Sequence, residues 1–364
     1  MRYKNHFFNR IPNSVLFLAL VTLFLFKIAF YILVKNEMVV FSLGGGSDAN
    51  YYNNYAQGYI NVALNVWPVI LRYLNSVGFY SREFISYVFL FLNLVTIPLI
   101  TAKLAGIKPS INQKYYFYIL LLCLIYPTLY FFTFDIYRDV FMVLCFLVGC
   151  LVVKKSLNST NNLGFILLFT VSLVIGWFLA ALRPYLGYAF LISLFLWKIK
   201  FTKKRIVFLG SSYFIVLFIA NYVGVLDALT EYRSGFEETG GGSTLGLDFS
   251  NPIMFIPNFI LSMLGQLMGL YVTNPLALIL LLIETVPFFF MLVYVIKNIK
   301  FADSFVRFLI IFFILYASVW LIGNDNLGTA VRLRMHNYLV VYISFFYILR
   351  LKKLSLEKSR VVNS

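Results

Sequence analysis

The sequence predicts an all-α, polytopic integral membrane protein. Of its 364 residues, 61% are hydrophobic and only 12% are charged, and the mean hydropathy is +0.86. Apolar runs long enough to cross a bilayer, about 20 residues each, recur along the whole chain. A soluble domain is therefore excluded. We expect a single transmembrane domain over residues 1–364, with about ten membrane-spanning helices.

The expected spans follow from the positions of the apolar runs. They lie at residues 14–34, 84–101, 115–133, 140–153, 163–182, 185–197, 206–225, 276–296, 308–322 and 338–350. The first run is too long for a removed signal peptide and has no small-residue cleavage site, so it is expected to stay as an anchor.

Two further apolar stretches are interrupted by proline, glycine or asparagine. Residues 59–80 contain Asn65 and Pro68, and residues 252–274 contain Pro257, Gly265 and Gly269. We expect both to form re-entrant or interfacial helices, because broken backbone is tolerated at membrane depth only where protein or water receives its polar groups. If 252–274 spans fully, the number of spans changes by one. The larger outer loops are expected at about 35–83 and 226–252.

Lysine and arginine counts in the loops predict the orientation, since short cytoplasmic loops hold the excess of positive charge. One side receives 21 of the 30 lysine and arginine residues, including those near both termini. That side is expected to be the cytoplasm, and both termini lie there. The net charge of +16 is therefore first a topological signal; binding to anionic lipid is a secondary interpretation, and nucleic acid is not expected as a partner.

The cysteine and histidine content argues against a disulfide framework and a metal site. Cys123, Cys145 and Cys150 all lie inside apolar runs, and the chain contains only His6 and His336. Neither zinc-ligand spacing nor a histidine-based centre is indicated. We therefore expect no metal and no cofactor.

The outer side has a different composition. It receives 11 of the 14 acidic residues, and its basic residues are almost all arginine. Arginine is preferred where a planar donor fork must hold phosphate or carboxylate. Each arginine could instead pair with a local acid, but their recurrence at span ends favours a shared anionic ligand.

The first outer loop combines tyrosines with an acid close to the membrane. In "SLGGGSDANYYNNYAQGYINVALN", Asp48 follows three glycines that we interpret as a flexible segment, and Tyr51, Tyr52 and Tyr55 follow Asp48. Tyrosine faces and amide side chains suit a sugar ring. An interfacial aromatic belt is the alternative, although a belt does not require the clustered asparagines.

Two further outer segments place charge at helix ends. In "FTFDIYRDVF", Asp135 and Arg138 could pair on one helical face, and Asp139 begins the next span, where it favours the positive end of the helix dipole. In "AALRPYLGY", Arg183 precedes Pro184, which is expected to break the helix and leave backbone donors beside a cation. The first arrangement is also consistent with a purely structural ion pair and cap, and the second suits an anion.

The segment "GNDNLGTAVRLRMHN" carries Arg332 and Arg334 before the last span. If it is helical, Arg332 and His336 share a face and Arg334 points about 200° away; if it is extended, both arginines project to the same side. Thr329 is a candidate cap. We favour a pair of arginines facing Asp48 across a cavity, with headgroup anchoring as the alternative.

Together these segments resemble a known family. The "SDANYYNNYA", "YRD", "RPY" and "NLGTAVRLR" segments are similar to the pattern of bacterial polysaccharide polymerases of the O-antigen polymerase (Wzy) type and of related membrane-embedded glycosyltransferases that use lipid-linked sugars. The resemblance is spread over most of the chain in short motifs. It implies a GT-C-like fold of many helices in the bacterial inner membrane and a substrate of oligosaccharide repeat units on undecaprenyl diphosphate. It also implies that a second protein that regulates the length of the polysaccharide is a possible partner.

The mechanism implied by the resemblance is glycosyl transfer on the outer leaflet. A sugar hydroxyl of one lipid-linked unit attacks the anomeric carbon of another, and lipid diphosphate leaves. Arg332 and Arg334 are the candidates for stabilising the leaving group, with Arg138 and Arg183 as additional candidates. Asp48 is the candidate general base, with Asp139 or Asp135 in reserve.

Two other functions are left open. A transferase that uses a lipid monophosphate sugar would employ the same base and add one sugar. A flippase of lipid-linked sugars would place ionisable groups near the midplane, where Lys27 and Glu284 lie; snorkelling and an interhelical hydrogen bond explain these two residues equally well. Finally, the glycine run at residues 239–243 is a candidate hinge in the large outer loop or a plain connector.

Overall fold

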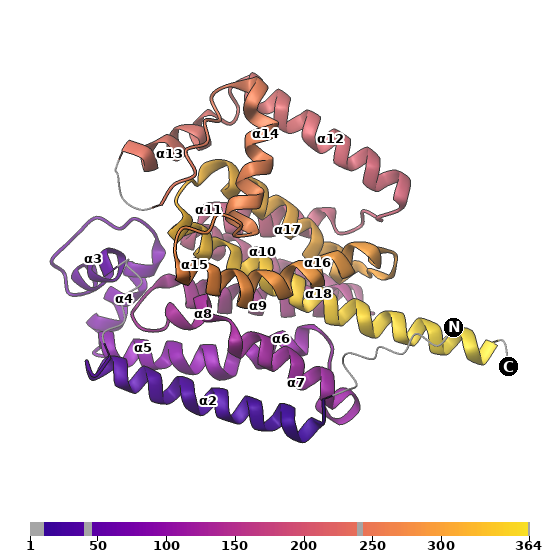
Figure 1. Cartoon of the computed structure of the whole chain (residues 1–364), viewed down its shortest axis with the longest axis horizontal. Coiled ribbons are helices and arrows are strands. Elements are labelled where there is room, and N and C mark those ends of the chain that lie inside the picture. The colour runs from indigo at the N-terminus through magenta and orange to yellow at the C-terminus, as the bar shows by residue number, and fades with distance from the viewer. Residues whose placement is uncertain (1–10, 40–45, 239–242, 363–364) are drawn as a thin grey trace. The chain divides into compact units, whose positions relative to one another are not determined.

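The protein is built almost entirely from helices. The computed structural model describes residues 11–39, 46–238 and 243–362 (Figure 1). Within these ranges, extended pairing is limited to an isolated bridge between Thr244 and Asn326. Seven of the described helices are long and apolar enough to cross a membrane. The prediction of an all-α polytopic membrane protein is therefore confirmed.

The helices cluster into two compact units, where the sequence predicts one transmembrane domain. The first unit comprises Met1–Lys155 and Leu168–Arg183, and the second comprises Ser156–Leu167 and Pro184–Ser364. The helix α10 (Asn162–Leu182) contributes residues to both. The chain therefore enters the second unit after Lys155, returns to the first at Leu168 and leaves it again after Arg183.

The first unit is formed by the N-terminal helices. In chain order these are α2 (Asn13–Lys35), α3 (Gly46–Ala56), α4 (Val66–Ser76), α5 (Arg82–Phe91), the π-helix η1 (Leu92–Thr96), α6 (Ile97–Leu104), α7 (Pro109–Ile125), α8 (Pro127–Phe131) and α9 (Arg138–Leu157). The three segments α5, η1 and α6 form one continuous span of 23 residues. The helix α7 packs against both α2 and α6.

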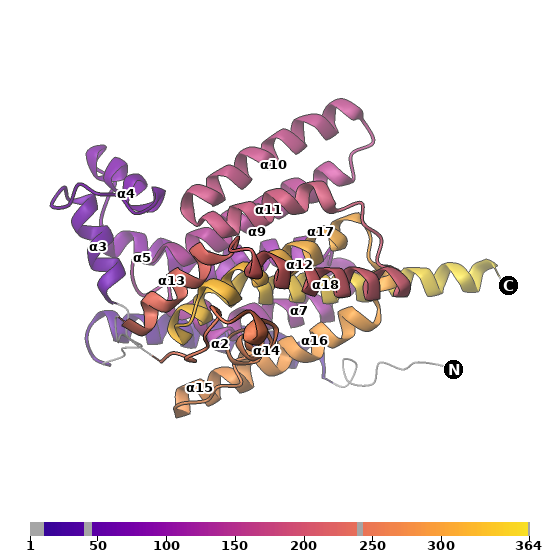
Figure 2. The same cartoon turned by 90° about the horizontal axis from the view of Figure 1, so that it is seen from above.

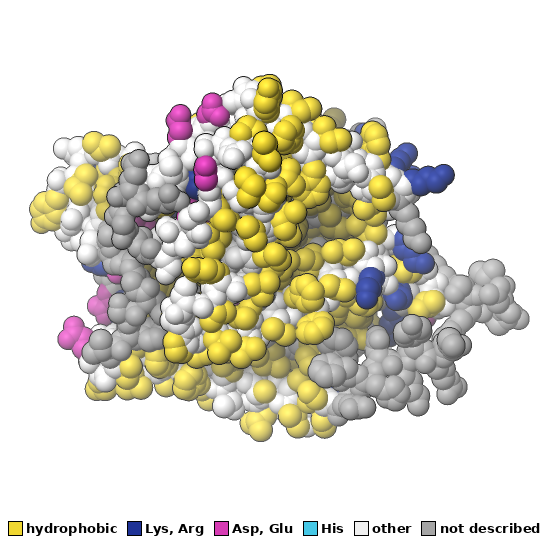
Figure 3. Space-filling model, turned by 45° about the horizontal axis from the view of Figure 1, so that its top comes forward, with side chains coloured by type: hydrophobic (Ala, Val, Ile, Leu, Met, Phe, Trp, Pro, Cys, Tyr) yellow, Lys and Arg dark blue, Asp and Glu magenta, His cyan; other side chains and the backbone are white. Residues whose placement is uncertain are grey.

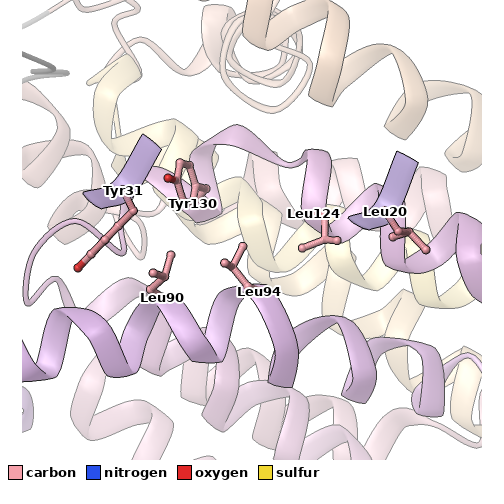
Figure 4. Packing of buried hydrophobic residues seen from close by; sticks show 6 residues of the cluster. All are labelled: Leu20, Tyr31, Leu90, Leu94, Leu124 and Tyr130. Atoms are coloured by element: carbon pink, nitrogen blue, oxygen red, sulfur yellow. The ribbon is translucent and has the colours of Figure 1, made fainter. Parts of the chain in front are cut away.

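A cluster of buried side chains joins these helices. As Figure 4 shows, side chains from α2, α5, η1, α7 and α8 converge, namely Leu20, Tyr31, Leu90, Leu94, Leu124 and Tyr130. Lys27 of α2 lies beside this cluster. It is 6% exposed, and its ammonium lies 4.2 Å from the centroid of the Tyr130 ring. Lys27 is therefore stabilised by an aromatic face inside the unit rather than by snorkelling to the membrane surface.

The second unit contains the C-terminal helices. In chain order these are α11 (Pro184–Leu196), α12 (Lys203–Tyr222), α13 (Asp227–Glu238), α14 (Pro252–Ser262) with η2 (Met263–Leu267), α15 (Pro275–Leu280) with η3 (Leu281–Thr285) and α16 (Val286–Lys297), η4 (Ile299–Phe301), α17 (Ser304–Gly323) and α18 (Leu327–Val362). The helix α17 is the centre of this unit and packs against both α11 and α18.

One helix of the second unit runs across its neighbours. In Figure 1, α14 and η2 cross the direction of α17 and α18 steeply, and Figure 2 shows α14 nearly end-on. The following residues 268–274 are not helical, and Asn274 then caps α15 by accepting a hydrogen bond from the Ala277 amide at 2.8 Å. The helical part of 252–274 is therefore limited to Pro252–Leu267, shorter than the roughly 20 residues that a transmembrane helix needs, in line with the broken pattern of its sequence.

The stretch 59–80 is also shorter as a helix than its apolar sequence. The helix α4 begins only after Asn65, whose side chain accepts a hydrogen bond from the Trp67 amide at 3.0 Å. It ends at Ser76, so it has 11 residues, about 16 Å of length. This is too short to cross the hydrocarbon core, which is about 30 Å thick.

Two of the expected spans have different boundaries in the structure. The expected span 115–133 is interrupted, because α7 ends at Ile125 and Pro127 forces Tyr126 out of the helical region. The expected span 338–350 is only the middle of α18, which has 36 residues. At about 1.5 Å per residue, α18 is about 54 Å long and extends well beyond one bilayer thickness.

Charge is segregated within the second unit. Figure 3 shows lysine and arginine side chains where α12 begins and α16 ends, and acidic side chains over α13. The helices thus separate the two kinds of charge along their length. This separation is the pattern that predicts the orientation, and the assignment of a cytoplasmic face stays a prediction.

Two π-helices of the second unit meet α18 at one residue. The Tyr338 hydroxyl donates to the Leu267 carbonyl of η2 at 2.7 Å and lies 2.9 Å from the Thr285 hydroxyl of η3. Gly269 follows η2 with a φ of +60°, and a Cβ placed there would come 2.7 Å from Nη1 of Arg334 on α18. The absence of a side chain at Gly269 therefore allows this backbone to approach Arg334 closely.

Replacing Gly269 by alanine should destabilise the protein more than the same change at Gly246. Both glycines have positive φ, but nothing lies within 4 Å of a Cβ at Gly246. The backbone cost of about 1–2 kcal/mol applies to both, and overpacking adds about 1–3 kcal/mol at Gly269 only. Thermal unfolding in detergent measures the difference. Equal melting temperatures for the two variants would show that the contact with Arg334 is unimportant.

Candidate functional site

The residues that the sequence predicts for the site are divided between the two units. The first unit holds Asp48, Tyr51, Tyr52, Tyr55, Asp135, Arg138, Asp139 and Arg183, and the second holds Arg332, Arg334 and His336. The predicted site residues therefore form two groups, one in each unit.

In the first unit, the predicted charges gather around Tyr52 of α3. Tyr52 is 5% exposed, and burial raises the pKa of its hydroxyl. The charge of Arg138 lowers this pKa, whereas those of Asp139 and Asp48 raise it. Such effects fade with distance, so the three charged groups lie within electrostatic range of the Tyr52 hydroxyl. Charged residues of α3 and of the start of α9 thus both act on the Tyr52 hydroxyl.

Asp139 and Arg183 form a buried pair of opposite charge. Asp139 lies in the first turn of α9, as expected, and Arg183 lies between the end of α10 and Pro184 at the start of α11. They are 2% and 5% exposed, and Oδ1 of Asp139 lies 3.8 Å from Nη2 of Arg183. This distance exceeds that of a hydrogen bond. Among the described residues, none donates a hydrogen bond to this oxygen.

Arg138 binds the end of a neighbouring helix. Its Nη1 donates a hydrogen bond to the Leu182 carbonyl at 2.9 Å, at the last residue of α10. The last carbonyls of a helix have no partner inside the helix and carry partial negative charge. Arg138 therefore brings the beginning of α9 to the end of α10, where Arg183 follows, while remaining half-buried.

The predicted pairing of Asp135 with Arg138 is wrong. Asp135 precedes α9 and instead accepts two hydrogen bonds from Arg82, at 2.8 and 2.6 Å. The same arginine donates to Asn50 of α3 at 2.9 Å. The helical spacing on which the prediction depended does not apply, because Asp135 lies outside the helix. Asp135 is thus engaged in a bidentate pair that links α5, α3 and the segment before α9.

The tyrosines of α3 are packed within the unit. Besides Tyr52, Tyr55 is buried at 7% exposure, and the guanidinium of Arg72 lies 4.0 Å from its ring centroid. The Tyr51 hydroxyl donates to the Val62 carbonyl at 2.5 Å and accepts from the Leu64 amide at 3.0 Å. The segment is a helix rather than an open loop, so the expectation that all three rings present faces to a sugar is wrong for Tyr52 and Tyr55.

An asparagine of α3 is also engaged inside the unit. Asn53 accepts a hydrogen bond from the Tyr80 hydroxyl at 2.8 Å. Burial is the main cause that raises the pKa of Tyr80 to about 12, so this hydroxyl keeps its proton and acts as a donor at neutral pH. Asn50 and Asn53 therefore fix the position of α3.

In the second unit, Arg334 is paired with an acid from another helix. Its Nη2 donates to Oε2 of Glu284 at 2.9 Å, and the two side chains are 4% and 0% exposed. Its guanidinium carbon lies 5.3 Å from the centroid of the Tyr338 ring. The sequence suggested that Glu284 bonds to a neighbouring helix, and it does so by accepting a hydrogen bond from Arg334 within an ion pair. Arg334 is therefore neither a headgroup anchor nor exposed at a lip.

The arginines at 332 and 334 do not converge. They lie in the helix α18, so Arg332 shares a face with His336 and Arg334 points about 200° away. Arg332 is half-buried, and His336 is buried with its Nδ1 3.5 Å from the Tyr316 hydroxyl. Thr329 is not the cap; its amide donates to the Asn326 side chain at 2.9 Å. The helical alternative therefore applies and the extended one does not, and binding of a diphosphate by these two arginines stays a prediction.

A second buried arginine of this unit is not singled out by the sequence. Arg233 of α13 is 3% exposed and pairs with Asp325, which also accepts a hydrogen bond from the Gly246 amide at 3.0 Å. Arg233 donates to the carbonyls at the end of α17, those of Leu321, Ile322 and Asn324. This arginine therefore joins α13 to the connection between α17 and α18.

The sequence identifies the charged residues of the first unit but not the polar residues that hold them in place. Arg82 and Asn65 contact the predicted site residues Asp135 and Tyr52, and Asn50 contacts Arg82, yet each is far from its partner in the chain or belongs to an ordinary polar stretch. A helix cap at Asn65 was the one detectable signal, since asparagine precedes an apolar run there. The glycine run 239–243 lies outside the described residues except for Ser243.

Among the described residues, no group of three or more histidine, cysteine or acidic side chains could hold a metal ion. No protein-family model, no curated protein and no solved structure matches the chain. The chemistry available to the protein is therefore inferred from the geometry of the two clusters.

Exchanging the charges of Arg82 and Asp135 tests whether this ion pair, through the bond from Arg82 to Asn50, holds α3 in place. Either Arg82→Asp or Asp135→Arg alone should lower the melting temperature in detergent, because hydrogen bonds to a charged partner contribute about 1.5–3 kcal/mol and this pair is partly solvated. The double exchange should recover part of the loss. If the double variant loses as much stability as the two single variants lose together, the two residues do not interact directly.

Neutralising Glu284 or Arg334 alone should be strongly destabilising. Either Glu284→Gln or Arg334→Gln leaves one buried charge, which costs about 3–5 kcal/mol. The double variant removes both charges and should be more stable than either single variant. Arg332→Lys is the matched control on the same helix and should change the melting temperature little, since Arg332 is only half-buried. Similar effects at both arginines would contradict the assignment.

Proposed function

We propose that this membrane-spanning protein is a glycosyltransferase that polymerises lipid-linked oligosaccharides, acting on repeat units carried by undecaprenyl diphosphate at the outer face of a bacterial inner membrane. The observation that carries this conclusion is the buried pair of Asp139 and Arg183 beside the Leu182 carbonyl that Arg138 binds, with the charges of Asp48, Arg138 and Asp139 all acting on the Tyr52 hydroxyl. Transfer of a sugar from a lipid diphosphate requires a carboxylate as base and guanidinium groups that stabilise the leaving diphosphate, and these helix ends supply both.

The leaving group is assigned to Arg138 and Arg183. When the anomeric carbon is attacked, its bond to the diphosphate oxygen breaks, and negative charge grows on the departing lipid diphosphate. Fixed guanidinium groups stabilise this charge in a site shielded from water. Arg138 is the first residue of α9 and donates to the last carbonyl of α10, and Arg183 directly follows that carbonyl in the chain. They replace Arg332 and Arg334, which diverge on α18.

The general base is assigned to Asp48. Its side chain is half-buried in the first turn of α3, so it is reachable by a substrate, whereas Asp139 is buried beside Arg183. The base accepts the proton of the attacking sugar hydroxyl as its oxygen bonds to the anomeric carbon. In this assignment, Asp139 orients Arg183 and lowers the cost of burying it.

Deletion of the gene followed by electrophoresis of surface polysaccharide tests the class of function. A polymerase predicts loss of the ladder of chain lengths with retention of a single capped repeat unit. Loss of all surface polysaccharide would instead indicate a flippase or an earlier transferase. A ladder of normal length would contradict a role in polymerisation.

Complementation with site variants tests the assigned residues. Asp48→Asn should lower polymer formation by about two to four orders of magnitude through loss of the base. Arg183→Lys keeps the charge but loses the planar fork, and it should lower the rate by about one to two orders of magnitude. The matched control is Asp227→Asn, which changes an acid in the first turn of the outer helix α13. Normal ladders from Asp48→Asn and Arg183→Lys, at equal protein abundance, would refute the assignment.

A further inference from the structure

The helix α4 exposes apolar side chains although it also buries apolar ones. Trp67, Pro68 and Leu71 are buried against the unit, whereas Val69 is 43% and Tyr73 is 67% exposed. The connections on either side continue this surface with large apolar side chains that are more than two-thirds exposed, namely Tyr59, Val62, Leu64 and Phe79. An apolar surface on both sides of a short helix calls for an apolar surrounding beyond the protein.

The position of α4 in the chain identifies that surrounding. It is too short to span the bilayer. Only a few residues separate it from α5, the start of a membrane span whose exposed side chains include Phe84, Tyr87 and Phe91. The exposed apolar side chains of α4 and Phe79 thus continue along the chain into a surface that lipid covers. Tyrosine is abundant in such positions because its ring is apolar and its hydroxyl reaches water.

The same helix holds the end of α3. Arg72 donates from Nε to the Tyr55 carbonyl at 2.9 Å and from Nη2 to the Ile60 carbonyl at 2.6 Å. Asn75 donates to the Ala56 carbonyl at 3.0 Å. These contacts satisfy the last carbonyls of α3. The two helices are therefore joined as a pair, and whatever fixes α4 also fixes α3.

We propose that α4 and its flanking connections form an interfacial anchor, with their exposed apolar side chains inserted into the lipid surface of the bilayer, and that the anchor sets the depth of α3. The ligand of this surface is the hydrocarbon of the membrane. The anchor acts through Arg72 and Asn75. It holds Asp48 and Tyr52 at the level of the lipid headgroups, and it does so whatever reaction the protein performs.

Spin-label accessibility in lipid nanodiscs tests the anchor. Nitroxide labels are attached at Val69→Cys or Tyr73→Cys in a chain whose Cys123, Cys145 and Cys150 are replaced by alanine. Both labels should collide more with oxygen, which concentrates in lipid, than with water-soluble nickel-EDDA. A label at Ser234→Cys on the outer helix α13, an exposed polar position, should show the opposite preference.

Two results would overturn the anchor. Nickel-EDDA accessibility at Val69→Cys and Tyr73→Cys equal to that at Ser234→Cys would place the surface in water. Low accessibility to both reagents would show that protein, such as a second copy of the chain, covers it.

The link to α3 is tested by adding Arg72→Gln. It should raise the nickel-EDDA accessibility of a label at Asn54→Cys on α3 while the label at Tyr73→Cys is unaffected. An unchanged label at Asn54→Cys would overturn the role of Arg72.

Discussion

The satisfaction of helix ends by cationic side chains is the interaction on which this structure depends. The last carbonyls of a helix have no partner within it, and among apolar helices little water replaces that partner. Among the described residues, four helix ends therefore receive a cationic donor from another element: α3 from Arg72, α6 from Lys154, α10 from Arg138 and α17 from Arg233. Each donor also matches the negative end of the helix dipole.

This constraint also explains how charged groups come to lie together at the proposed site. Acids favour the first turn of a helix, and Asp48 and Asp139 occupy that position in α3 and α9. A cation is favoured near the last carbonyls of a helix; the side chain of Arg138, at the start of α9, donates to the last carbonyl of α10, and Arg183 directly follows α10. Where the start of one helix meets the end of another, carboxylates and guanidinium groups become neighbours. The chemistry of the site thus uses groups that the helix ends attract in any case.

The sequence predicts the helices well because hydropathy, proline and asparagine act locally. The break at Arg183 and Pro184 and the position of Asp139 in a first turn are confirmed on this basis. The beginning of α18 is misplaced by hydropathy, because "GTAVRLRMHN" lacks the continuous apolar run of a span although nothing in it interrupts a helix. The three π-helices in the described part of the chain have no sequence signal of this kind.

The pairing of charges could not be predicted, because it depends on residues distant in the chain. Asp135 had Arg138 three residues away but pairs with Arg82, 53 residues away. Arg334 pairs with Glu284, 50 residues away, and this pair removes it from the predicted phosphate site. Several outer arginines suggested one shared anion, whereas the structure gives most of them separate partners inside the protein.

The most direct measurement of the central claim uses the purified protein in lipid with a synthetic oligosaccharide repeat unit on polyprenyl diphosphate. Mass spectrometry follows both the lipid-linked products and the released lipid. The account predicts products that contain two, three and more repeat units on one lipid, with one polyprenyl diphosphate released for each bond formed. Transfer of a single monosaccharide, or movement of the lipid-linked unit across the bilayer without any new glycosidic bond, would contradict it.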